Sequence, residues 1–124
     1  MENGYIWAIN GCEFELDMED ADTAERYVSA LGVLERAESA NFSDISSKIR
    51  FYCKTCREFY DALLGEGASE KIFAGIGENA RKYDEIFTSL LDFIAGQRNS
   101  ATLRMENLTK RYTPKRAKNV KSFV

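Results

Sequence analysis

The stretch FYDALLGEGASEKIFAG, residues 59–75, places three glycines, a serine and a lysine after an apolar run, as many phosphate-binding loops do. A Walker loop needs G-x-x-x-x-G-K-[ST] between a strand and a helix, so that backbone N–H groups and the lysine surround a phosphate. Here Gly65 and Gly67 are only two residues apart, and two glutamates would place negative charge beside the phosphate. We therefore interpret the segment as a corner between helices, in which Gly65 ends one helix and Ser69 caps a short one.

Cys53 and Cys56 form the second motif with chemical potential, a C-x-x-C pair. Such a pair is a redox centre when it opens a helix in a thioredoxin-like unit, or half of a zinc site when two further ligands exist. This pair falls in the middle of a predicted helix on its apolar face, and Cys12 is the remaining cysteine. We therefore predict free thiols packed in the core, with no metal site.

The chain contains no histidine, which excludes more chemistry than its motifs supply. Ser-His and Cys-His nucleophiles, His-metal clusters and a side chain that ordinarily titrates near neutrality are all ruled out. The 20 acidic residues have spacings expected on solvated faces and do not converge on a pocket. We therefore expect a protein that is not an enzyme and uses no cofactor.

Charge is divided along the chain, although the whole carries a net charge of only −3. Residues 1–96 hold 19 acidic and 9 basic residues, a net charge of −10, whereas residues 97–124 hold 1 acidic and 8 basic residues, a net charge of +7. Such asymmetry is typical of a nucleic-acid-binding arm, of a segment that docks on an acidic partner or another copy, or of a solvated tail. The candidate contact residues of the tail are Lys110, Arg111, Lys115, Arg116, Lys118 and Lys121.

Length and composition predict one helix-rich domain, since 124 residues with 44% hydrophobic content and a single proline can bury a modest core. No stretch approaches the roughly 18 apolar residues of a membrane span, and the acidic start lacks the features of a signal peptide. An odd number of cysteines fits a reducing compartment. We therefore expect a cytoplasmic protein.

A β-hairpin is predicted at the start of the chain. In YIWAINGCEFEL, apolar residues alternate on both sides of Asn10-Gly11. This dipeptide favours a two-residue type I′ turn because both turn positions need positive φ. The pattern predicts strands at about residues 5–9 and 12–17.

Two amphipathic helices are predicted next. The first covers about residues 22–37 and opens with DTAE, a capping box with Asp22 in the cap position. The second follows Ser43 as its N-cap and carries a broad apolar stripe as far as Leu64. Gly65 then occupies the position of a C-terminal cap.

The last strong helical pattern covers about residues 79–96, and we expect Gly96 to end it. In the tail that follows, Ala101, Met105, Leu108 and Tyr112 keep a helical spacing, and Pro114 would stop any helix formed there. The sequence therefore predicts a mainly α fold: an N-terminal β-hairpin, then a bundle of three main helices plus a short helix, with a basic C-terminal tail. We expect residues 1–96 to form the hairpin and helical body, and residues 97–124 a partly disordered or weakly helical tail.

Two segments carry a resemblance to a known family: INGCEFELDMEDADTAERYVSALGVLE, a hairpin leading through an acidic linker into a helix, and the corner FYDALLGEGASEKIFAG. Together with the aromatic-bearing final helix, this order over about residues 8–96 resembles small tail assembly chaperones of long-tailed (siphovirus-type) phages and prophages of Gram-positive bacteria. Neither segment is a catalytic signature. The tail lies outside the part that carries the resemblance.

The resemblance implies a protein that coats the helical tape measure protein in the host cytoplasm until tail tube subunits displace it. It also implies self-association, absence from the mature virion, and contact of the C-terminal tail with the tube protein. Aromatic residues are the usual anchors of apolar partner helices. The candidates for partner binding are Tyr52, Phe59, Tyr60, Phe73, Tyr83 and Phe87. The alternative is a helical assembly module whose basic tail binds nucleic acid, although the acidic body would repel a phosphate backbone.

Overall fold

The N-terminal hairpin is the first element of the computed structural model, which describes residues 4–111. Strands β1 (Ile6–Ile9) and β2 (Cys12–Glu15) pair antiparallel. Between them, Asn10 and Gly11 have φ angles of 47° and 78°, the pair of positive angles that a type I′ turn requires. The predicted hairpin is confirmed, with shorter strands than expected.

Helix α1 (Ala21–Ala37) ends where the sequence predicts but begins earlier. Its N-cap is Asp20, whose carboxylate accepts the Thr23 N–H at 3.1 Å and also the Thr23 hydroxyl. The prediction of Asp22 as the cap is therefore wrong, because the acidic linker offers several carboxylates and this one satisfies two donors.

Helix α2 (Ile45–Leu64) is also capped away from the predicted position, by one residue. The Asp44 carboxylate, rather than the Ser43 hydroxyl, accepts the Ser47 N–H at 2.7 Å. A carboxylate makes the stronger bond here because it is charged and faces the positive end of the helix dipole. The helix ends at the predicted cap, Gly65, whose φ is 109°.

The glycine-rich segment forms a corner between helices, as predicted, and contains the short helix α3 (Ala68–Ile72). Gly67 is its N-cap residue, in the left-handed region, so the prediction of a Ser69 cap is wrong. Instead, the Asp61 carboxylate accepts both the Ser69 N–H at 2.9 Å and the Ser69 hydroxyl at 3.1 Å. A helix precedes the corner, and a carboxylate takes the N–H that a phosphate would need.

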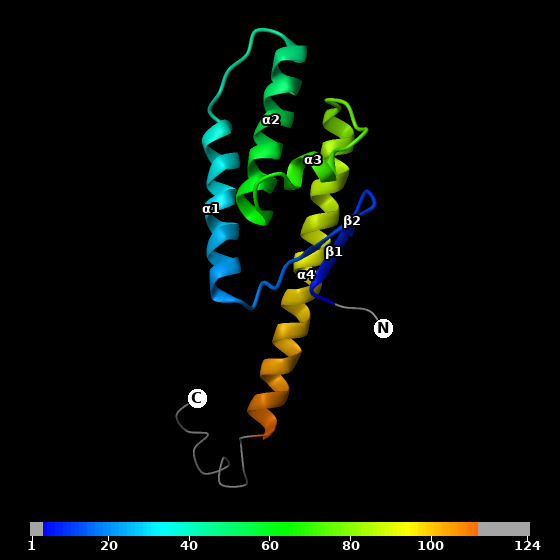
Figure 1. Cartoon of the computed structure of the whole chain (residues 1–124). Helices are drawn as coiled ribbons and strands as arrows, with labels where there is room; N and C mark the ends of the chain where they lie inside the picture. The colour runs from blue at the N-terminus through cyan, green and yellow to red at the C-terminus, as the bar shows by residue number, and fades with distance from the viewer. Residues whose placement is uncertain (1–3, 112–124) are drawn as a thin grey trace.

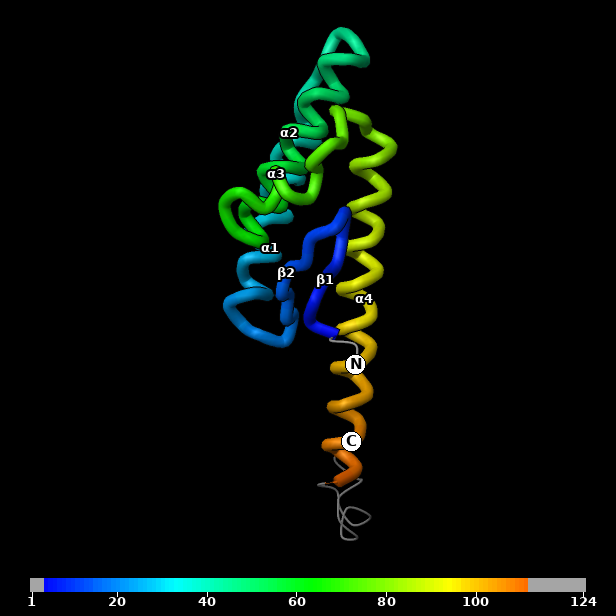
Figure 2. Tube along the Cα trace, turned by 45° about the vertical axis from the view of Figure 1, so that its right-hand side comes forward, coloured from blue at the N-terminus to red at the C-terminus, as the bar shows by residue number. Residues whose placement is uncertain are grey.

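Helix α4 (Ala80–Arg111) is the longest element and does not end at Gly96. A glycine inside a helix costs about 1 kcal/mol relative to alanine. The residues that follow are mostly good helix formers, and the next one, Gln97, is buried. The helix therefore continues through the glycine for 15 residues into the segment predicted as a tail. Figures 1 and 2 show this end of α4 extending beyond the rest of the described chain.

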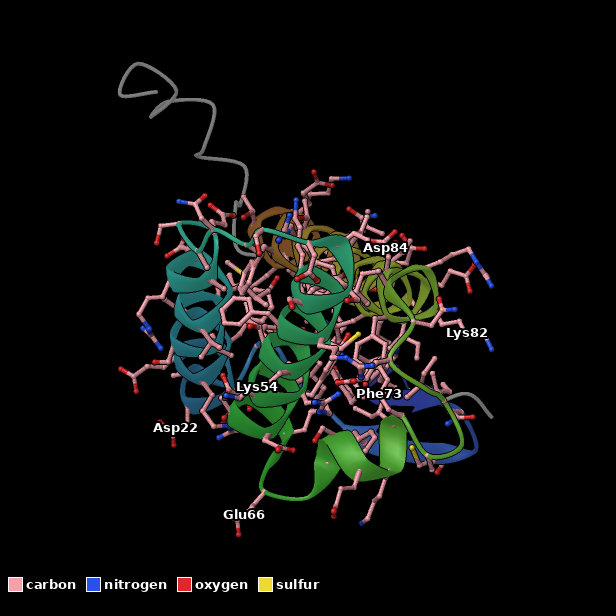
Figure 3. All side chains as sticks on the ribbon, turned by 90° about the horizontal axis from the view of Figure 1, so that it is seen from above. Asp22, Lys54, Glu66, Phe73, Lys82 and Asp84 are labelled. Carbon is pink, nitrogen blue, oxygen red and sulfur yellow. The ribbon has the colours of Figure 1, made fainter. Side chains whose placement is uncertain are left out.

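The core lies between the four helices and the hairpin. Helix α2 packs on α1, on α3 and on α4, whereas α1 and α4 have at most slight contact with each other. In Figure 3, which looks down on the body, Asp22 and Glu66 lie at the periphery and Phe73 lies between α2, α3 and α4. The large side chains buried most completely are Leu16, Phe59, Tyr60, Leu63, Ile72, Tyr83 and Leu90.

The hairpin is fixed to the helices by side-chain hydrogen bonds at both of its ends. At the turn, the Asn10 amide donates to the Ile72 carbonyl at 2.8 Å. At the open end, the Gln97 amide of α4 accepts the Met18 N–H at 2.8 Å and donates to the carbonyls of Gly4 and Leu16. Both views show the hairpin lying beside α4 (Figures 1 and 2).

Candidate protein-binding groove

Four of the six aromatic residues expected to contact a partner lie in the core. Phe59, Tyr60, Phe73 and Tyr83 are each at most 5% exposed. Phe73 and Tyr83 stack with ring centroids 3.8 Å apart, and Phe59 meets Tyr60 edge-to-face at 5.0 Å. In this conformation these four rings hold α2, α3 and α4 together and leave almost no surface for a partner.

The remaining two, Tyr52 and Phe87, are half-buried and face a common groove. The groove lies between the C-terminal end of α1, the loop that follows it, the first half of α2 and the start of α4. It has a volume of about 580 Å³, and its lining is mainly apolar. The principal lining side chains are Leu34, Phe42, Phe51, Tyr52, Cys56 and Phe87.

The outer end of the groove is formed by an aromatic pair that sequence reasoning missed. Phe42 and Phe51 have ring centroids 4.9 Å apart at an angle of 44°. Phe42 lies in the loop between α1 and α2 and is 39% exposed. Periodicity could not identify it, because a loop residue belongs to no helical stripe. The signal that the sequence did carry is an aromatic residue within an otherwise polar run, NFSD.

The floor of the groove is uncharged near neutral pH. Burial raises the pKa of the Cys56 thiol to about 11. Burial also raises the pKa of the Tyr52 hydroxyl above its usual range, and the neighbouring Cys56 adds to this shift. Charged groups are confined to the rim, where Glu38, Lys48 and Asp84 contribute to the lining. A groove with a neutral apolar floor and a charged rim suits an apolar side-chain cluster.

The two cysteines of the C-x-x-C pair lie where the apolar stripe predicts. Cys53 and Cys56 are buried on α2 and are free thiols. Burial also raises the pKa of Cys53, so both thiols stay protonated and weakly nucleophilic near neutral pH. Among residues 4–111, no three His, Cys, Asp or Glu side chains are grouped so that they could hold a metal ion.

The basic residues predicted to make tail contacts are remote from this groove. Lys110 and Arg111 are exposed in the last turn of α4, at the end of the helix opposite to the groove (Figure 1). The other four, Lys115, Arg116, Lys118 and Lys121, lie outside the described residues. The described part of the chain has no helix of the length and apolar character that a membrane crossing requires.

The fold and the groove define a class: a small, mainly helical protein with an N-terminal β-hairpin and an aromatic groove between its helices. The chain belongs to DUF6673, a family of unknown function, whose model matches residues 10–122. The match therefore includes the whole of α4 as well as the hairpin turn. No curated protein and no solved structure matches the chain.

Proposed function

We propose that this protein is a tail assembly chaperone of a long-tailed phage or prophage, which binds the tape measure protein stoichiometrically until the tail tube assembles. The observation that carries the proposal is the open, aromatic groove between α1, α2 and α4. The resemblance of the hairpin, linker and corner sequences to that family supplies the identity of the partner. The proposed mechanism is burial of apolar surface and involves no reaction.

The arrangement of the helices explains how such a groove stays accessible. Because α1 and α4 both pack on α2 but hardly on each other, the three helices leave one side of the bundle open. An amphipathic helix that enters this side would pack against all three, in the manner of a helix bound in a groove. Each large apolar side chain of the partner that becomes fully buried contributes about 1.5–3 kcal/mol. A few anchors are therefore enough to keep a partner helix from aggregating.

The groove rim makes the partner's charge pattern predictable. Two of its three charged residues, Glu38 and Asp84, are acidic, and residues 1–96 carry a net charge of −10. A bound helix with Lys or Arg beside its apolar face is therefore favoured over one with Asp or Glu, mainly through a faster association rate. This preference separates binding at the groove from nonspecific adhesion to apolar surface.

The test is co-expression with a tape measure protein from the same genome. We expect the tape measure protein to remain soluble and to co-purify with this chain in a fixed ratio, without nucleotide or metal. Aggregation of the tape measure protein beside a folded partner would contradict the proposal. Binding of the full chain to duplex DNA with a steep salt dependence would favour the nucleic-acid alternative instead.

A further inference from the structure

The C-terminal part of α4 continues beyond the body with little cover from the rest of the described chain (Figures 1 and 2). Gln97 is the last buried residue of the helix, and in the segment 98–111 only Ala101 is half-buried. Leu103 and Met105 are each 60% exposed, and Leu108 is 37% exposed. We call residues 98–111 the α4 extension.

One face of the α4 extension is apolar. Ala101, Met105 and Leu108 are separated by four and three residues, the spacing of neighbouring core positions in paired helices. This face continues the stripe that Leu90 and Ile94 bury inside the body. Leu103 has the same exposure as Met105 but lies on nearly the opposite side of the helix, because two residues rotate it by about 200°.

The α4 extension makes little contact with the body that would stabilise it as a helix. Isolated helices of fewer than about 12–15 residues are marginal in water, and most helical stability in proteins comes from burying an apolar face. Arg104 of the extension forms an ion pair with the body: its guanidinium lies 2.7 Å from the Glu19 carboxylate. Both side chains of this pair are exposed. Such pairs contribute at most about 1 kcal/mol. Among residues 4–111, no other segment covers the apolar face, and a second molecule would supply that cover.

The distribution of charge indicates which molecule covers the apolar face and in which direction its helix runs. The α4 extension holds four basic residues and one acidic residue, whereas Asp17–Glu25 holds five acidic residues and no basic one. The pair between Arg104 and Glu19 shows that these two segments meet at the base of the body. A parallel pair of extensions would place Lys110 and Arg111 against their own copies. An antiparallel pair carries the basic end of each helix back toward the acidic base of the other body.

We propose that the α4 extension forms an antiparallel pair with the same segment of a second copy of this chain, through the face of Ala101, Met105 and Leu108. The basic end of each helix, Lys110 and Arg111, then lies near the acidic Asp17–Glu25 segment of the other copy. The pairing does not use the groove, so its test is independent of the test of tape measure binding. Two heptads of apolar contact give a weak interface, and its stability depends on the charges as well.

Sedimentation of the full chain tests the pairing with a matched pair of variants. We expect a concentration-dependent dimer that weakens as salt is raised. Met105→Gln should raise the dimer dissociation constant by at least about tenfold, since it removes an apolar side chain from both sides of the interface. Leu103→Gln replaces an equally exposed apolar side chain on the other face of the helix. It should leave the dimer dissociation constant unchanged. Circular dichroism is used to check that both variants keep their helicity.

Cross-linking then tests the direction. Single variants Ala101→Cys and Leu108→Cys, which lie opposite each other in an antiparallel pair centred near Met105, are mixed and mildly oxidised, with the unsubstituted chain as the control for its own cysteines. The antiparallel pairing predicts that the disulfide between the two different variants exceeds either homodimer. A chain that stays monomeric at millimolar concentration, an equal response to Met105→Gln and Leu103→Gln, or homodimer disulfides alone would overturn the proposal.

Discussion

Gln97 shows how one polar residue joins distant parts of the chain. It is 7% exposed, and its amide bonds to three backbone groups from the N-terminal segment and the linker after β2. Gln97→Met keeps the volume and helix propensity but leaves these buried groups unpaired. We expect it to lower the free energy of unfolding by about 3 kcal/mol. Arg98→Met on the exposed side should change it by less than about 0.5 kcal/mol, and equal urea midpoints would contradict the assignment.

The buried thiols and phenols predict how stability depends on pH. Burial raises the pKa of Cys56 to about 11 and raises that of Tyr60, so the folded state holds these protons more tightly than the unfolded state. Their contribution is present in full below the unfolded thiol pKa, near 8.5, and is lost as pH rises through the folded values. We expect the free energy of unfolding to fall by on the order of 2 kcal/mol between pH 8.5 and 11.

Urea titrations under reducing conditions at several pH values measure this loss. In Cys56→Ala the curve should start lower, by on the order of 1–3 kcal/mol for a small core truncation, and fall less steeply between pH 8.5 and 11. Stability that is constant to pH 11 in the parent chain would show that the thiol is not held protonated by burial.

At the scale of elements, sequence patterns located every helix and the hairpin but misplaced several ends. The hairpin turn, the cap at Gly65 and the end of α1 at Ala37 were predictable, because they depend on local backbone preferences. The N-cap of α1 at Asp20 and the hydrogen bond from Ser69 to Asp61 were not, because neighbouring carboxylates compete for the same N–H groups. The helical spacing of Ala101, Met105 and Leu108 indicated part of the continuation of α4 past Gly96, whereas the tertiary hydrogen bonds of Gln97 appear in no local pattern.

Deletion of residues 98–124 tests whether the body is independent of the α4 extension. Every buried residue of the described chain lies at or before Gln97, and the Arg104–Glu19 pair is exposed. We expect the truncated chain to unfold cooperatively on heating, with a loss of at most about 1 kcal/mol. Loss of the cooperative transition would show that the extension belongs to the core. The truncated chain should also be monomeric.

At the scale of the whole molecule, the candidate site was only partly predictable. Aromatic content pointed to a partner-binding surface, but an amphipathic stripe does not distinguish rings that fill the core from rings that face a groove. Of the six candidates, Tyr52 and Phe87 line the groove, and the other four are buried. Phe42 and Phe51 come together because the loop after α1 folds over the start of α2, a relation between segments that periodicity within one segment does not contain.

The positions of the groove and the α4 extension have a consequence at the same scale. The groove lies at one end of α4 and the α4 extension at the other (Figure 1), so the proposed partner binding and the proposed pairing of copies use separate surfaces. A row of copies could therefore coat a long partner helix while each copy also contacts another. This geometry fits a protein that acts in stoichiometric amounts along a repetitive partner.

The central claim is that the aromatic groove holds an apolar helix, and two substitutions three residues apart test it most directly. Phe42 lines the groove, whereas Ile45, 75% exposed at the start of α2, does not. Both residues are exposed, but Phe42 also packs on Phe51, so the fold of each variant must be checked first. Co-purification of the tape measure protein is measured with Phe42→Asp and Ile45→Asp, after circular dichroism has shown equal helicity. We predict that Phe42→Asp loses the tape measure protein while Ile45→Asp retains it, and equal retention by both variants would contradict the claim.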